Sequence, residues 1–230
     1  MLRLAGFFVS ILVLCAILRQ VPIVGALFRI PFVGFWISAL IVSGLVAWLA
    51  SSAIDRGRRA ALVRQLGAVD TPHNRGKLGS LFASQRRWRR ALPHLEAAVA
   101  GEPDVAEWSY RFGRALLGSG LPDEARVALE RTVEIDEEHA YGDALLRLAE
   151  AQHEGGHPEG ALETLERFER NHGPRPESAY RRGRALKVLG RKSEARAAFE
   201  EVGDLASQSA RYQRKVGTGW ALRAFWARLR

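Results

Sequence analysis

The chain has 230 residues, a single cysteine at position 15 and a formal net charge of +9. This length leaves room for about one ordinary domain plus a further segment, and one cysteine excludes an intrachain disulfide framework and a cysteine-rich metal site. Residues 1–71 carry +5 (seven Arg, two Asp) and residues 206–230 carry +6 (five Arg, one Lys), whereas the part between them carries −2 (21 basic, 23 acidic residues). Nucleic-acid binders usually concentrate basic residues and aromatics on one dedicated surface, so this distribution makes nucleic acid an unlikely partner.

Two uncharged apolar runs occupy the beginning of the chain, at residues 4–18 and 30–54. The second has 25 residues, enough to cross a bilayer core of roughly 30 Å, and Trp36 and Trp48 lie toward its ends, as aromatic residues at membrane interfaces do. The first run is shorter. We expect residues 1–54 to form a transmembrane hairpin, and one span with an interfacial segment is the alternative.

The arginines around these runs predict an orientation. Arg19 and Arg29 lie between the runs, while Arg3 and a cluster beyond residue 54 flank them. That cluster is Arg56, Arg58, Arg59 and Arg64. Cytoplasmic loops carry an excess of Lys and Arg. We therefore expect the hairpin to lie in the inner membrane of a cell, with everything after it in the cytoplasm. Residues 55–71 are then a basic juxtamembrane linker whose arginines contact lipid phosphate, each contributing about 1 kcal/mol.

A repeated phrase defines the rest of the chain. Residues 110–130 read YRFGRALLGSGLPDEARVALE, and residues 180–200 read YRRGRALKVLGRKSEARAAFE. The positions Gly79, Gly113, Ala149 and Gly183 are separated by 34, 36 and 34 residues, as are Ala91, Ala125, Ala161 and Ala195, and Leu95, Leu129, Leu165 and Phe199. This pattern resembles the tetratricopeptide repeat, a helix–turn–helix unit of 34 residues, and together with the apolar runs it resembles membrane-anchored bacterial proteins of that family.

The resemblance implies an all-α fold, with an α-solenoid of about four helix pairs after the hairpin. We place the repeats at 72–105, 106–139, 142–175 and 176–209, with two extra residues around 139–142. Thr71 before Pro72 is typical of a helix start, and Gly120 and Gly190 are placed to end the first helices of their pairs. The small residues in register let paired helices approach closely.

Residues 210–230 predict a basic amphipathic helix. Leu222, Phe225, Trp226 and Leu229 follow the i, i+3, i+4, i+7 spacing of one helical face, and the Gly217–Gly219 stretch separates this piece from the array. The helix either caps the open end of the array, which needs a cap, or lies on anionic lipid.

The family resemblance also implies a concave groove lined by the second, fifth, ninth, twelfth and thirteenth positions of each repeat. In repeats two to four these positions are Glu107, Tyr110, Arg114, Leu117, Asp143, Leu146, Glu150, His153, Glu177, Tyr180, Arg184, Lys187 and Val188. In repeat one they are small and neutral, at His73, Gly76, Ser80, Ala83 and Ser84. Arg114, Arg184 and Lys187 could hold a carboxylate and the tyrosines could anchor a partner. Alternatively, the Tyr and Arg residues brace the next repeat.

The stretch HEGGH at 153–157 matches the zinc-peptidase pattern, in which two histidines on one helical face bind zinc and the Glu acts as general base. The repeat register places Gly155 and Gly156 at a turn, which would separate the histidines, so we expect solvated turn residues. A second cluster, Arg86, Arg87, Arg89 and Arg90, is expected to be a solvated face, with lipid or nucleic-acid contact as alternatives.

We therefore expect a non-enzymatic, membrane-anchored adaptor whose cytoplasmic array binds a partner protein or a second copy, for example in assembling or regulating a membrane complex. It should need no cofactor, metal or small-molecule substrate. The alternatives are a zinc hydrolase using His153, Glu154 and His157, and a tether in which the basic ends bind lipid or nucleic acid.

Overall fold

A computed structural model describes residues 31–208 and 214–229 of the chain, and all regular structure in these ranges is helical. The helices are α3 (Pro31–Ala68), α4 (Pro72–Ser84), α5 (Trp88–Gly101), α6 (Ala106–Ser119), α7 (Pro122–Ile135), α8 (Asp143–Glu154), α9 (Pro158–His172), α10 (Pro176–Val188), α11 (Lys192–Gln208) and α12 (Arg214–Leu229). The chain divides into two units, Met1–Leu62 and Val63–Arg230, which are described separately. The predicted apolar segment 4–18 lies outside the described residues.

The long helix α3 differs from its sequence prediction in where it ends. It continues without a break to Ala68, so most of the stretch 55–71 that we interpreted as a linker is helical. Ala, Leu, Arg and Gln dominate this stretch and are strong helix formers, and no proline interrupts it before Pro72. Among the residues that the structure describes, no helix combines the length and hydropathy that a membrane span requires.

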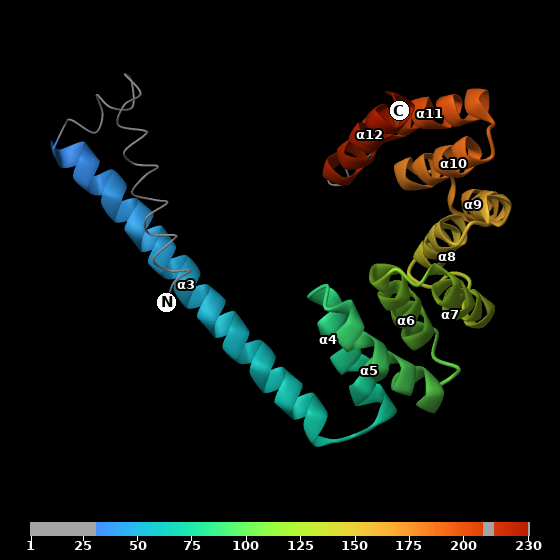
Figure 1. Cartoon of the computed structure of the whole chain (residues 1–230). Helices are drawn as coiled ribbons and strands as arrows, with labels where there is room; N and C mark the ends of the chain where they lie inside the picture. The colour runs from blue at the N-terminus through green and yellow to red at the C-terminus, as the bar shows by residue number, and fades with distance from the viewer. Residues whose placement is uncertain (1–30, 209–213, 230) are drawn as a thin grey trace. The chain divides into compact units, whose positions relative to one another are not determined.

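The second unit contains the predicted array, confirmed as an all-helical solenoid. Repeats one to four are the helix pairs α4–α5, α6–α7, α8–α9 and α10–α11. The first helices of neighbouring repeats contact one another, α6 with α4 and α8, and α8 with α10. Figure 1 shows α6, α8 and α10 on the inner side of the arc that this unit forms, and α7, α9 and α11 on its outer side.

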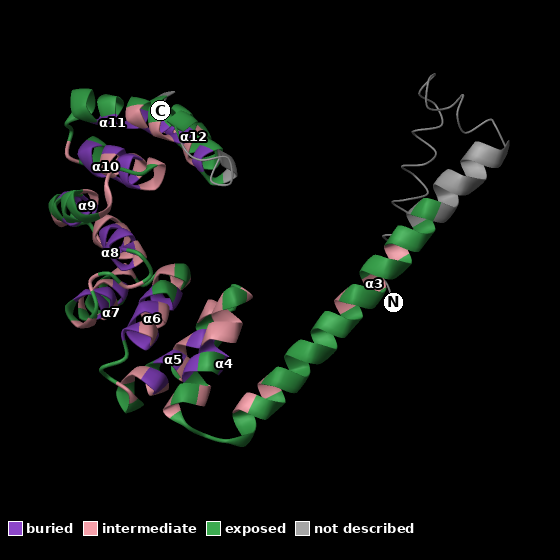
Figure 2. Cartoon of the chain, turned by 180° about the vertical axis from the view of Figure 1, so that it is seen from behind, coloured by how far each residue is buried: buried purple, intermediate pink, exposed green. Residues whose placement is uncertain are grey.

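Close contact at the glycines explains why the helices pair. A Cβ atom added to Gly113 would lie 2.6 Å from Cγ of Leu129, and one added to Gly183 would lie 2.6 Å from the ring of Phe199. Gly79 faces Leu95 in the same way. Because the interior is close-packed, the predicted small positions are required for the large apolar side chain of the partner helix to fit. Buried residues accordingly lie between the paired helices in Figure 2.

The core is divided unevenly along the array. A large cluster extends from Tyr110 through repeats two, three and four to Ala224 of α12. A much smaller one consists of Ala91, Leu95 and Ala115, where repeat one meets repeat two. In α4 the buried residues are Gly76, Leu78 and Gly79, so this helix contributes a single large apolar side chain to the core.

Local signals in the sequence correspond to the observed helix ends. Thr71 Oγ1 accepts a hydrogen bond of 3.2 Å from the backbone N–H of Asn74 at the start of α4. Gly120, with φ of 79°, ends α6 in the left-handed conformation that glycine favours. The two extra residues between repeats two and three form a left-handed turn, in which Ala140, Tyr141 and Gly142 have φ of 54°, 56° and 78°.

Helix α12 caps the array, as one of the two alternatives expected, and it does so through the face opposite to Leu222, Phe225 and Trp226. It packs on α10 and α11 with small residues: Ala224 is buried, and a Cβ added to Gly217 would lie 3.2 Å from Ala206. The predicted apolar face is instead exposed, at 59% for Leu222, 49% for Phe225 and 56% for Trp226, while the side chain of Leu229 lies outside the described residues. The predicted break at Gly217–Gly219 is absent, because both glycines lie within α12. Gly217 serves packing instead, since α12 approaches Ala206 of α11 closely there, which favours a residue without a side chain.

Candidate partner-binding groove

The predicted groove residues lie on α6, α8 and α10, but several of them are occupied within the fold. Leu146 is 2% exposed and belongs to the core, and Tyr110 is 7% exposed. The Tyr110 hydroxyl donates a hydrogen bond to Asp143 in the next repeat. Tyr110 therefore braces the next repeat, which was the alternative to groove binding.

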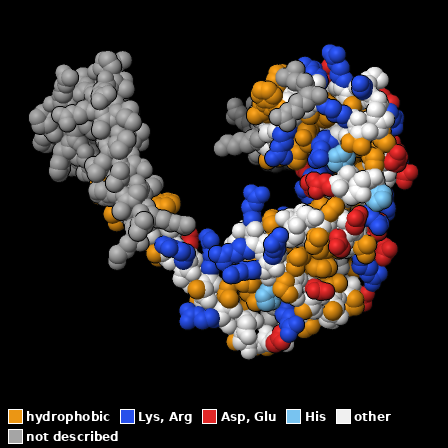
Figure 3. All heavy atoms as spheres, viewed as in Figure 1, with side chains coloured by type: hydrophobic (Ala, Val, Ile, Leu, Met, Phe, Trp, Pro, Cys, Tyr) orange, Lys and Arg blue, Asp and Glu red, His pale blue; other side chains and the backbone are white. Residues whose placement is uncertain are grey.

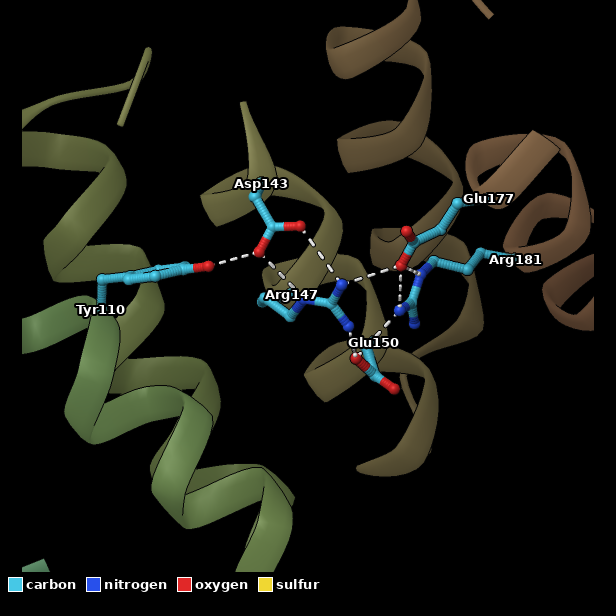
Figure 4. Close-up of polar contacts among 6 residues, drawn as sticks. All are labelled: Tyr110, Asp143, Arg147, Glu150, Glu177 and Arg181. Atoms are coloured by element: carbon cyan, nitrogen blue, oxygen red, sulfur yellow. Dashed lines mark hydrogen bonds and ion pairs between the residues drawn. The ribbon is translucent and has the colours of Figure 1, made fainter. Parts of the chain in front are cut away.

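An ion-pair network joins repeats three and four (Figure 4). Arg147 donates to both oxygens of Asp143 at 3.1 and 3.2 Å, to Glu150 at 2.7 Å and to Glu177 at 2.9 Å. Arg181, which is 7% exposed, donates to the same two glutamates, at 3.0 Å to Glu150 and 2.6 Å to Glu177. The carboxylates of Asp143 and Glu150, which were predicted to line the groove, are thus paired with arginines of the array itself.

The pKa values in this network follow from its charges. Burial alone would raise the pKa of Asp143, but the hydrogen bonds and positive charge of Arg147 outweigh burial and lower it below its ordinary value of 3.8. Glu150 behaves similarly, since burial opposes and the charges of Arg181 and Arg147 produce a pKa below 4.5. Burial and the hydrogen bond to Asp143 raise the pKa of Tyr110, so its hydroxyl stays protonated and remains a donor.

Sequence reasoning missed the two arginines at the centre of this network, although a signal for them was present. An acidic residue followed four positions later by Arg recurs at Glu107–Arg111, Asp143–Arg147 and Glu177–Arg181, and all three pairs form ion pairs. Residues four apart lie on the same face of a helix. The recurrence of this acid–Arg pair at about the repeat period could therefore have predicted ion pairs within the first helix of each of these repeats.

A hollow of about 560 Å³ lies between α10 and α12. Its lining is aromatic and basic, formed by His153, Tyr180, Arg184, Lys187, Val188, Phe199, Arg223, Trp226 and Ala227. The ring of Tyr180 contacts those of Phe199 and Trp220 at a tilt, with ring centroids 5.9 and 5.4 Å away. Lys187 Nζ donates to the backbone oxygen of Ala227 at 2.8 Å, which ties α12 to α10.

Three arginines on this side lack a carboxylate partner within the part of the chain that the structure describes. Arg114 lies over the ring of Tyr110 at 5.5 Å, and Arg223 lies over the ring of Trp220 at 4.5 Å. Arg184 forms neither an ion pair nor a ring contact there. In contrast to Arg147 and Arg181, these guanidinium groups keep their charge available to a ligand.

His153 borders the same hollow and is held neutral. Burial, followed by the nearby charges of Arg184 and Arg181, lowers the pKa of His153 below 6.5, and its Nδ1 atom is buried without a hydrogen-bond partner in the described residues. A carboxylate entering the hollow would offset the arginine charges that lower this pKa.

Repeat one supplies little to the groove. Gly76 is buried and lies so close to Trp108 that an added Cβ would be 2.6 Å from the indole, and His73 contacts the edge of the same ring at 5.5 Å. Ser80 donates to the backbone oxygen of Gly76 at 2.7 Å. Gly76 and His73 therefore pack against repeat two, whereas the Ser80 hydroxyl is satisfied within α4.

The HEGGH stretch does not form the geometry of a zinc peptidase. His153 lies in the last turn of α8, Gly156 has φ of 83°, and His157 is the residue before α9. The two histidines are thus on different helices rather than on one face. Within residues 31–208 and 214–229, no group of three or more His, Cys, Asp or Glu side chains is placed to hold a metal ion.

Comparison with known proteins identifies the fold. The tetratricopeptide repeat family model matches residues 77–140 and 146–210, more than half of the chain. A search of curated proteins found no match. Similar solved structures include "MamA MSR-1 C2" (TM-score 0.60, 19% identity, 69% of this chain and 93% of that chain), MamA from Desulfovibrio magneticus RS-1 (0.52, 15%, 68% and 94%) and a putative kinesin light chain from Podosopora anserina (0.56, 21%, 71% and 94%). At these identities the likeness is one of fold.

Proposed function

Because the chain belongs to the tetratricopeptide repeat family, we propose that its array is a scaffold that binds a partner protein through the hollow between α10 and α12. The observation that carries this proposal is the unpaired charge of Arg184 and Arg223 beside exposed apolar side chains of Val188 and Trp226. Guanidinium groups bind carboxylates with two parallel hydrogen bonds. The partner we propose is therefore an acidic segment that also carries an apolar side chain.

The experiment compares two charge-matched variants of the full chain. Arg184→Gln/Arg223→Gln removes two positive charges from the hollow, and Arg170→Gln/Lys192→Gln removes two from exposed positions elsewhere on the array. We expect chemical crosslinking in cells to lose the specific adduct in the first variant and keep it in the second. Equal retention, or equal loss, in both variants would exclude the hollow as the binding site.

A second copy of the chain is the other partner in this class. In that case the crosslinked adduct has twice the mass of the chain, and sedimentation of the purified protein shows a dimer that the Arg184→Gln/Arg223→Gln variant loses.

We also propose that residues 4–18 and 30–54 anchor the chain in the inner membrane, with the array in the cytoplasm. The charge-free run at 30–54 and the arginines beyond it support this, as do the exposed side chains of Leu40, Val42, Val46 and Ile54 along α3. Anchoring raises the effective concentration of any membrane-bound partner. Alkaline carbonate should leave the chain in the membrane pellet; release into the supernatant would exclude an integral anchor.

A further inference from the structure

Four arginines surround Trp88 at the turn between α4 and α5. Arg86, Arg87, Arg89 and Arg90 are all exposed, and within the described ranges none of them forms an ion pair. Arg75 of α4 and Arg111 of α6 differ, since each forms an ion pair with a carboxylate. Positive charges this close together repel one another, so an anion bound at this turn would relieve the repulsion.

The turn is fixed by packing rather than free to move. An added Cβ at Gly118 would lie 2.5 Å from the indole of Trp88, so the ring lies directly on the end of α6. Arg86 has the left-handed φ of 57°, and backbone hydrogen bonds of 2.9 and 3.0 Å join Arg86 and Arg87 to the end of α4. The four arginine Cα positions are therefore held in place before any ligand binds.

The arginines border a shallow hollow of about 570 Å³ that also includes Trp88, Gly118 and Ser119. The Ser119 hydroxyl oxygen is buried there without a hydrogen-bond partner in the described residues. Helix α5 begins at the same place with neither a side-chain cap nor an acidic residue in its first turn. The partial positive charge and free N–H groups of a helix start favour an anion. In the view of Figure 3, Lys and Arg side chains lie at several places on the surface of the array.

We propose that this turn, Arg86–Arg90 with Ser119, binds the phosphate groups of anionic phospholipid headgroups. Arg pairs with phosphate through two hydrogen bonds, and several guanidinium groups on an open surface suit a surface that presents many phosphates. Base stacking, which single-stranded nucleic-acid binding uses, is disfavoured because Trp88 is packed on Gly118. The assignment to lipid rests on the membrane anchor proposed above.

The test measures amide hydrogen exchange at Trp88 and Arg89, the first helical N–H groups of α5, in the full chain reconstituted into nanodiscs. Phosphatidylcholine discs are compared with discs that also contain phosphatidylglycerol. We expect exchange to be roughly tenfold slower with phosphatidylglycerol, the protection given by a ligand at about ten times its Kd. Arg89→Gln/Arg90→Gln should abolish this protection, and the charge-matched Arg170→Gln/Lys192→Gln should retain it.

Two results would overturn the proposal: no protection with phosphatidylglycerol, or equal loss in both variants. Protection by inorganic phosphate in phosphatidylcholine discs would assign the site to soluble phosphate, and protection by short duplex DNA would assign it to nucleic acid; either result rejects the lipid assignment. If carbonate extraction shows that the chain is not anchored, the same amides are measured with phosphatidylglycerol liposomes, so failure of the anchor and failure of this site remain distinguishable.

Discussion

Arg147 contacts three carboxylates from two repeats, and its side chain is mostly buried. Removing one partner of a buried ion pair leaves charges without compensation. We expect Arg147→Met to lower the free energy of unfolding by about 3 kcal/mol. Arg126→Met is the control, since within the described ranges Arg126 pairs only with Glu130 on its own helix, and its loss should cost about 0–1 kcal/mol. Urea unfolding at neutral pH measures both; equal losses would show that the network does not join the repeats.

Arg147 also affects how the free energy of unfolding depends on pH. The pKa values of Asp143 and Glu150 are lower in the folded chain than their ordinary values of 3.8 and 4.5. Their contribution to stability is therefore complete above those values and lost as the pH falls through the folded pKa values, beginning below about pH 5. Over this acid range, Arg147→Met should lose less stability than the wild type. Parallel curves of unfolding free energy against pH for the two proteins would contradict the pairing of Arg147 with these carboxylates.

At this scale, the sequence was a partial guide. The resemblance placed Asp143 and Glu177 on the inner side, where the structure has them, but it could not show that Arg147 and Arg181 occupy their carboxylates. Which of two nearby charges pairs with a third depends on the distance between neighbouring repeats. That distance is set by packing across about 34 residues and not by local spacing.

Gly113 determines how closely α6 approaches α7. Alanine there would place a methyl group against Leu129, which is fully buried and cannot move aside. We expect Gly113→Ala to destabilise the chain by about 1–3 kcal/mol through overpacking. Gly203→Ala is the control, because that glycine lies in α11 with open space around it, and alanine favours a helix by about 0.5–1 kcal/mol. Thermal unfolding would contradict the packing argument if both changes had the same sign.

The helices were easier to predict than their side-chain contacts, because the same pattern of small and large apolar residues recurs in each repeat. The small residues at the repeat period predicted a close approach of paired helices, and the structure confirms this approach where Gly79, Gly113 and Gly183 face Leu95, Leu129 and Phe199. Helix α12 occurs once, so its sequence offers no such repetition. Its apolar residues Leu222, Phe225 and Trp226 left capping and lipid contact open, and the structure places the small residues Gly217 and Ala224 against the array.

For the molecule as a whole, the docking of α12 completes the array, and two positions on that helix test it. Ala224 is buried against α10 and α11, so Ala224→Glu should undock the helix and destabilise the chain by roughly 2 kcal/mol or more. Leu222→Glu changes an exposed position and should alter stability by less than about 0.5 kcal/mol. Calorimetry of the full chain measures both. A similar shift in melting temperature for the two variants would show that α12 is not held by its small face.

The small core at repeat one has a consequence for the order in which the array opens. Repeat arrays are stabilised by each unit and by its neighbours, and repeat one brings only Leu78 as a large buried side chain in α4, whereas repeats two to four share the large cluster. Transient opening, and with it cleavage by proteases, should therefore begin at α4 and proceed toward α10. The hollow beside α12 would stay assembled while the opposite end unravels, so a bound partner would be retained through partial unfolding.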